Sequence, residues 1–202
     1  YRSLAVIVVL VLVAGFSPIP SHSGEILNQN LSDTLKADLE LRHRLESKDN
    51  FDFNDAINDE DAFHLVRTRL MLNWKPQETT RIFFQVQDAQ ASNVAGGNKA
   101  GKADYLDIRQ GYLELADVLD GQAEVRLGRQ ELSFGKQRLI GGFNWSNVAQ
   151  SFDGIRVTWT LKESGAVINA FTGEKVKIKS NEFNEFRDSG DRLSGLYATW
   201  EK

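Results

Sequence analysis

The sequence predicts an all-β protein, an antiparallel transmembrane β-barrel of which about eight strands are present. Three observations lead to this fold class. Apolar and polar side chains alternate along most of the chain, the connections alternate between short and long, and tryptophans recur at the ends of every second strand. A soluble antiparallel β-sandwich is the alternative, because its strands alternate as well.

The alternation is clearest in residues 35–46, LKADLELRHRLE, where mostly apolar and charged side chains exchange at every step. A period of two places the two kinds on opposite faces of a strand. The same pattern runs through residues 64–74, 80–87, 122–127, 154–161 and 196–201. Residues 105–115 and 166–172 resemble strands but break step, and we expect a β-bulge in the first.

The predicted connections are short at 75–77, 117–121 and 162–165, and long at 47–61, 88–104, 131–151 and 173–191. Outer-membrane barrels have tight periplasmic turns and long extracellular loops, whereas a sandwich has no reason to sort its loops by length. Trp74, Trp159 and Trp200 then fall at the periplasmic ends of descending strands, where an aromatic girdle is expected.

The charged face is expected to line the lumen, because an arginine facing lipid at mid-membrane costs about 2–4 kcal/mol. Summed over the strands, the inward positions carry an excess of about four positive charges, and cationic rings in a pore select for anions. The predicted pore-lining residues are Arg67, Arg69, Arg81, Arg109, Arg126 and Arg156.

One segment resembles a known family. Its marks are Gly128-Arg129-Gln130, Gly135, Gln137-Arg138-Leu139-Ile140-Gly141, Trp145, Asn147 and Phe152-Asp153-Gly154-x-Arg156. This stretch is similar to the alginate-export family of outer-membrane porins, and the resemblance covers most of the mature chain. It implies a monomeric barrel of about eighteen strands, of which this chain would be the N-terminal part.

The glycines of residues 131–151 suit a loop that folds back and packs closely. Such a loop would narrow the lumen, with Arg129 and Arg138 lining the constriction, because a guanidinium binds carboxylates in bidentate fashion. The alternative is that these two arginines tie the loop to acidic residues of the barrel wall.

The N-terminus carries Arg2, an apolar run from Leu4 to Phe16 and small residues at Ser21 and Ser23. This pattern predicts a cleaved signal peptide at residues 1–23, with a signal anchor as the alternative. Residues 24–202 are then the N-terminal part of the barrel, a fragment, located in the bacterial outer membrane.

Other classes of function have little support. A net charge of −4 argues against nucleic acid as a partner, and the chain has no cysteine and three histidines. Residues 96–103 approach a P-loop, but Ala103 supplies no hydroxyl for Mg²⁺ and a strand follows. The acidic segment 47–61 is either a solvated loop or a calcium site. We expect no enzyme, no cofactor and no metal.

The sequence therefore predicts a channel that passes an anionic or polar solute by passive diffusion, with an anionic polysaccharide such as alginate, or a small anionic solute, as its partner. Outer-membrane lipid and periplasmic export machinery are further expected partners. The alternative is a non-transporting surface protein, either an adhesin-like barrel or a carbohydrate-binding sandwich.

Overall fold

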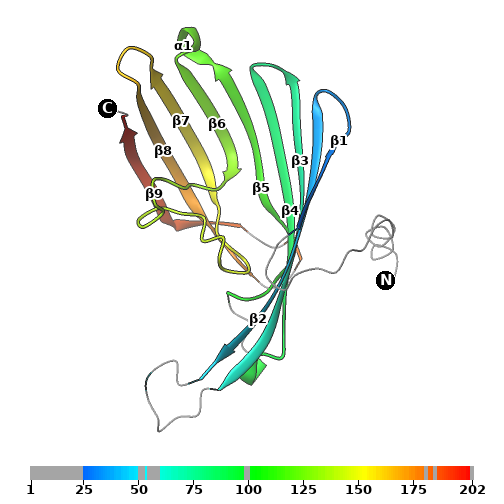
Figure 1. Ribbon diagram of the computed structural model, residues 1–202. Coiled ribbons are helices and arrows are strands. Elements are labelled where there is room, and N and C mark those ends of the chain that lie inside the picture. The colour runs from blue at the N-terminus through cyan, green and yellow to red at the C-terminus, as the bar shows by residue number, and fades with distance from the viewer. Residues whose placement is uncertain are drawn as a thin grey trace.

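The computed structural model describes residues 25–49, 53, 60–97, 101–179, 182–183 and 186–200. Among these, nine strands form one antiparallel sheet in which each strand pairs with its neighbours in chain order (Figure 1). They are β1 (Glu25–Asn30), β2 (Leu35–Lys48), β3 (Asp61–Gln77), β4 (Thr80–Ser92), β5 (Asp104–Asp117), β6 (Ala123–Gln130), β7 (Phe152–Leu161), β8 (Ala166–Lys177) and β9 (Phe186–Thr199). Two short helical segments, η2 (Ala95–Gly97) and α1 (Val118–Gly121), lie in connections.

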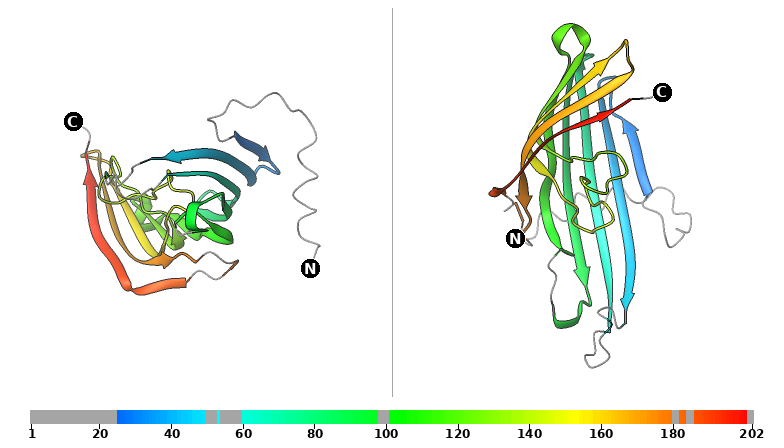
Figure 2. Two further views of the ribbon diagram at one scale, coloured as in Figure 1. Left: turned by 90° about the horizontal axis from the view of Figure 1, so that it is seen from below. Right: turned by 90° about the vertical axis from the view of Figure 1, so that its left-hand side faces the viewer.

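The sheet curves into a trough, and the segment between β6 and β7 lies inside its curve (Figure 2). The predicted all-β antiparallel class is confirmed, and eight of the strands match predicted segments. The structure adds β1, whose sequence EILNQN lacks a period-two pattern. Its register with β2, from Glu25↔Leu41 to Asn30↔Lys36, follows the backbone ladder, which does not require patterned side chains.

The alternation of connections is also found in the structure. Short turns at 31–34, 78–79, 118–122 and 162–165 gather at one end of the sheet, at the top of Figure 1, and the long connections start from the other end. Trp74 in β3 and Trp159 in β7 lie beside short turns, and Trp200 directly follows β9. Their role as an aromatic girdle stays a prediction.

Some sequence-based predictions fall outside the described residues. The signal peptide at residues 1–23 lies there, as do most of the acidic segment 47–61 and the centre of the P-loop-like segment. Within the part of the chain that the structure describes, no helix has the length and apolarity needed to cross a bilayer.

The predicted bulge in 105–115 is present at Arg109. Gln85 pairs with Gln110 and the next residue, Val86, pairs with Ile108, so Arg109 is the extra residue in β5. A bulge lets two consecutive side chains point to one face. Both Arg109 and Gln110 accordingly reach the trough, where the Gln110 amide donates to Gln85 Oε1 at 2.9 Å.

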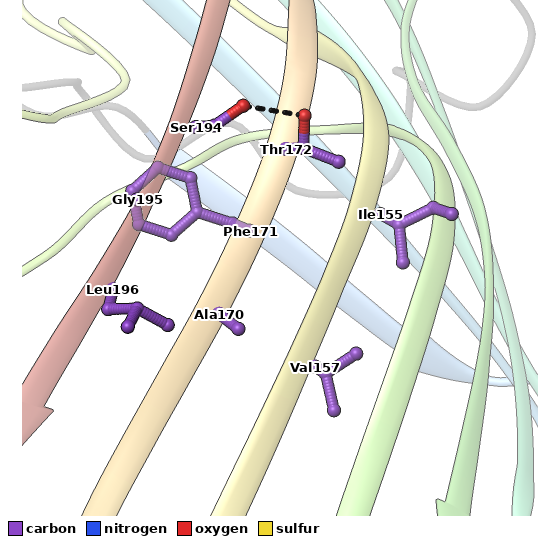
Figure 3. Close-up of a pocket in the computed structure, with 8 residues that line it drawn as sticks. All are labelled: Ile155, Val157, Ala170, Phe171, Thr172, Ser194, Gly195 and Leu196. Atoms are coloured by element: carbon purple, nitrogen blue, oxygen red, sulfur yellow. Dashed lines mark hydrogen bonds between the residues drawn. The ribbon is translucent and has the colours of Figure 1, made fainter.

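The convex face of the sheet is apolar. Leu70 is 44% exposed, Ile155 43% and Leu196 78%, whereas Arg67 on the opposite face is only 4% exposed. A shallow hollow of about 520 Å³ lies on this side, and Figure 3 shows Ile155, Ala170 and Leu196 among the residues that line it. The sheet thus turns its apolar face outward and its charged face into the trough, the reverse of a soluble sheet protein.

A row of glycines crosses three strands in register: Gly128 in β6, Gly154 in β7 and Gly173 in β8. A Cβ on Gly154 would lie 2.2 Å from the Thr172 carbonyl oxygen, and one on Gly128, whose φ is +124°, would lie 2.4 Å from a backbone oxygen of β5. Only glycine permits this close approach. Beside the row, the trough accommodates Leu132 of the β6–β7 connection, which packs with Phe152 and Phe171.

Candidate functional site

The β6–β7 connection, residues 131–151, forms a two-lobed loop across the trough. The first lobe (residues 132–140) is closed by a hydrogen bond from the Phe134 amide to the Ile140 carbonyl at 3.1 Å. The Phe134 ring stacks between Phe171 and Tyr197, with ring centroids 4.8 and 5.1 Å apart. The first lobe therefore rests on β8 and β9.

The second lobe (residues 141–150) reaches the opposite wall of the trough. Arg42 of β2 and Arg67 of β3 both donate to the carbonyl oxygens of Asn144 and Ser146, at distances between 2.8 and 3.1 Å. Arg69 donates to the side-chain oxygen of Asn144 at 3.1 Å. Guanidinium groups have five donors and no acceptor, so backbone carbonyls in a turn are suitable partners. The second lobe is bound to the sheet by these arginines.

Glu131 completes this attachment. Its carboxylate accepts two hydrogen bonds of 2.9 Å from the Asn144 amide and one of 3.0 Å from Arg109, which is 4% exposed. Glu40 of β2 accepts from Arg67 and lies 3.6 Å from Arg69. Because buried guanidinium groups require counter-charges and acceptors, these two carboxylates make the buried arrangement tolerable. Arg42, Arg67, Arg69 and Arg109 are called the anchor arginines below.

Amide side chains fix the far end of the second lobe. Asn147 is 1% exposed, and its amide nitrogen donates to the carbonyl oxygens of Gln90 at 3.1 Å and Lys102 at 2.9 Å. Gln87, 2% exposed, donates to the Val148 carbonyl at 2.9 Å. The loop thus holds together β2, β3 and β4 with the β4–β5 connection.

A second group of arginines lies nearer the short turns and is not under the loop. Arg81, Glu114, Arg126 and Arg156 stand directly opposite one another across β4, β5, β6 and β7. The side chains of the three arginines are 27%, 14% and 17% exposed, respectively. Arg81, Arg126 and Arg156 are called the arginine rung below.

The arginine rung is paired with carboxylates rather than with carbonyls. Glu114 accepts from Arg81 at 3.4 Å and from Arg126 Nε at 2.7 Å, and Glu124 accepts from Arg156 at 3.2 Å. The Arg126 guanidinium also lies 4.3 Å from the centroid of the Tyr112 ring. Three cations share two carboxylates, so this rung carries a net positive charge on a partly open surface.

The structure separates the two residues predicted to line the constriction. Arg138 lies in the exposed tip of the first lobe, and no hydrogen bond or ion pair joins its side chain to another described residue. Arg129 lies in strand β6 instead, on the same face as Leu127, and donates to Asp153 at 2.9 and 3.1 Å. The loop does not bring these two arginines together.

Sequence reasoning missed the residues that hold the loop. Alternation places Arg42 on the charged face of residues 35–46 and predicts no contact with the loop, and no pattern assigns a role to Glu131, Asn144 or Gln87. Neither Asn144 nor Gln87 carries a charge that could identify it, and Arg69, a partner of Asn144, and Val148, a partner of Gln87, lie 75 and 61 residues away along the chain. Within the described part of the chain, no group of three or more histidine or acidic side chains is arranged to hold a metal ion.

A protein-family model described as alginate export matches residues 33–202 of the chain. Comparison with curated proteins and with solved structures gave no match. The matched residues include β2 to β9, the two-lobed loop and both groups of arginines.

Proposed function

Because the chain belongs to the alginate-export family of outer-membrane transport proteins, we propose that it builds part of the wall and the constriction of a channel for an anionic solute. The substrate class is an anionic polysaccharide such as alginate, and passage is by passive diffusion. The observation that carries this proposal is the arginine rung, a partly exposed row with more cations than carboxylates inside an outwardly apolar sheet.

The two groups of arginines take different parts in this proposal. The arginine rung and Arg138 meet the solute, because their guanidinium groups are accessible and match the geometry of a carboxylate. The anchor arginines contribute indirectly, by holding the loop across the trough. Of the predicted pore-lining residues, Arg67, Arg69 and Arg109 therefore act through the loop rather than on the solute.

The pairing of the rung with Glu114 and Glu124 favours passage over retention. Conduction requires binding that is strong enough for entry and weak enough for release. A solute carboxylate exchanges with a protein carboxylate that already occupies part of each guanidinium. Successive uronate groups can therefore bind at the rung and leave it without a deep energy minimum.

The outward face fits a lipid environment. Leu70, Ile155 and Leu196 are exposed there, and the hollow of Figure 3 adds an uneven apolar surface suited to acyl chains. Trp74, Trp159 and Trp200 would mark the periplasmic boundary. A contact with periplasmic export machinery would use the end that carries the short turns.

The test is the reversal potential of the full-length protein in a planar bilayer under a KCl gradient. We expect anion selectivity that decreases when Arg81, Arg156 and Arg138 are all replaced by glutamine. Heat-modifiable migration in detergent gels verifies that the variant is folded. Cation selectivity, or no conductance from a folded barrel, would reject the proposed channel.

A further inference from the structure

Trp145 is an exposed tryptophan on the second lobe, on the inner side of the sheet. Its exposed fraction is 76%, although tryptophan is highly buried on average. The other three tryptophans of the chain, Trp74, Trp159 and Trp200, all lie at the short-turn end of strands. An aromatic ring of this size on a polar, inward-facing loop calls for a ligand with an apolar face.

The backbone around Trp145 is fixed by three consecutive arginine contacts. The carbonyl oxygens of Asn144 and Ser146 accept from Arg42 and Arg67, and the carbonyl oxygen of Trp145 accepts from Arg44 at 2.5 Å. A ring whose backbone is fixed in this way loses little further freedom when a ligand binds to it.

One face of the ring is already occupied. The Arg44 guanidinium carbon lies 4.3 Å from the ring centroid, within the range of a cation–π contact, and Glu46 holds the same guanidinium at 2.5 Å. Arg44 thus covers one face and sets the tilt of the ring. The high exposure of the side chain leaves the opposite face for a ligand.

We propose that Trp145 is a stacking platform for a pyranose ring of the passing polysaccharide. A pyranose presents a patch of C–H groups on one face and hydroxyl groups around its edge, and the C–H patch fits a flat aromatic surface. This inference rests on the proposed function and deepens it, because it adds recognition of the sugar ring to recognition of the carboxylate. Neutral and anionic sugars both carry the C–H patch.

Two probes and two variants separate these contributions. The probes are a neutral gluco-oligosaccharide and an oligouronate of equal length, each added to the full-length protein in a planar bilayer while the blocked fraction of the current is recorded. We expect Trp145→Ala to raise the half-blocking concentration of both probes by about five- to tenfold, a typical size for the loss of an aromatic contact. Arg138→Gln should raise it for the oligouronate alone.

Trp145→Phe and Leu139→Ser provide the controls. Phenylalanine has a smaller ring and should retain part of the block. Leu139 is 96% exposed on the other lobe, and Leu139→Ser should leave the half-blocking concentration of both probes unchanged. Alanine keeps the carbonyl oxygen of residue 145 and its hydrogen bond from Arg44, so the resistance of residues 131–151 to proteolysis should be kept.

If the channel is anion-selective but Trp145→Ala and the unsubstituted protein have equal half-blocking concentrations for both probes, the stacking role is overturned. The proposed function would then still stand. Faster proteolysis within residues 131–151 in Trp145→Ala would also overturn the stacking role, since it would show that the ring supports the loop. If the unsubstituted protein shows no anion selectivity, the channel proposal itself is rejected.

Discussion

The anchor arginines and the arginine rung share one face of one sheet, yet their surroundings differ. The side chains of Arg67 and Arg69 are 5% and 7% exposed and bind loop carbonyl and amide oxygens, whereas the Arg81 side chain is 27% exposed and shares Glu114 with Arg126. The anchor group is covered by the loop that it binds, while the rung keeps some exposed surface for a mobile partner. The same residue type on the same face therefore serves structure in one place and solute contact in the other.

The difference lies in the partners and not in the number of charges. A carbonyl in a fixed turn is an immobile acceptor and gives the guanidinium a permanent geometry. A carboxylate on a neighbouring strand can be exchanged for a carboxylate of similar chemistry on a solute. The comparison between the two groups can be tested by removing one member of each.

The largest effect is expected for Arg67→Met. This change removes two hydrogen bonds to the loop and leaves the half-buried Glu40 carboxylate without the buried Arg67 partner. Loss of one partner of a buried ion pair costs about 3–5 kcal/mol in the free energy of unfolding. We also expect faster proteolysis within 131–151 and a higher conductance, because the second lobe is released from the wall.

The matched control for this change is Arg156→Met, which removes an arginine of the rung on the same face. Urea unfolding in lipid vesicles should show a clearly smaller loss of stability, and proteolysis of the loop should be unchanged. Equal losses of stability for the two variants would mean that the two groups of arginines do not differ.

A smaller effect is expected for Glu114→Gln. It neutralises the carboxylate shared by Arg81 and Arg126 and raises the net charge of the rung by one. One unit charge about 8 Å from a solute ion is worth about 0.5 kcal/mol in water, which favours anions and disfavours cations by about twofold each. The ratio of anion to cation permeability should therefore rise by about fivefold. The reversal potential measures this ratio, and Glu40→Gln, under the loop, is the control that should leave it nearly unchanged.

The opposite sign is expected for Arg156→Gln. Its side chain is 17% exposed and paired with Glu124, so its loss lowers the charge of the rung by one. The anion-to-cation permeability ratio should fall by up to about fivefold. A rise, or no change in a folded protein, would show that the rung does not face the solute.

The strands could be predicted from the sequence, whereas the contacts of the loop could not. Alternation at Arg67, Arg69 and Arg81 correctly assigned the face of each side chain, because a strand allows only two directions. Alternation could not tell which of these arginines is covered. The loop that covers Arg67 lies about 75 residues away along the chain, and it makes its contacts through backbone carbonyls. The bulge at Arg109 was detectable because it interrupts a local pattern.

Arg129 is a second residue whose surroundings the sequence alone did not predict. Its position next to a glycine-rich segment suggested a constriction, but the strand continues to Gln130, and its period places Arg129 on the face of Leu127. The tip of the first lobe, with Lys136 and Arg138 exposed, agrees better with the expectation for the loop. The local composition was enough to predict the loop. Which arginine belongs to the loop depends on where β6 ends, and β6 ends at Gln130.

The smallest effect on selectivity is therefore expected for Arg129→Gln. The side chain is bound to Asp153 on the face away from the trough, so the reversal potential should stay within error of the unsubstituted protein. Stability should fall by about 1 kcal/mol or more, because Asp153 loses a charged partner. Arg138→Gln, on the loop tip, should by contrast shift the reversal potential toward cation selectivity. If Arg129→Gln shifts it as strongly, the solute reaches Arg129 and the assignment of the two faces at the end of β6 is wrong.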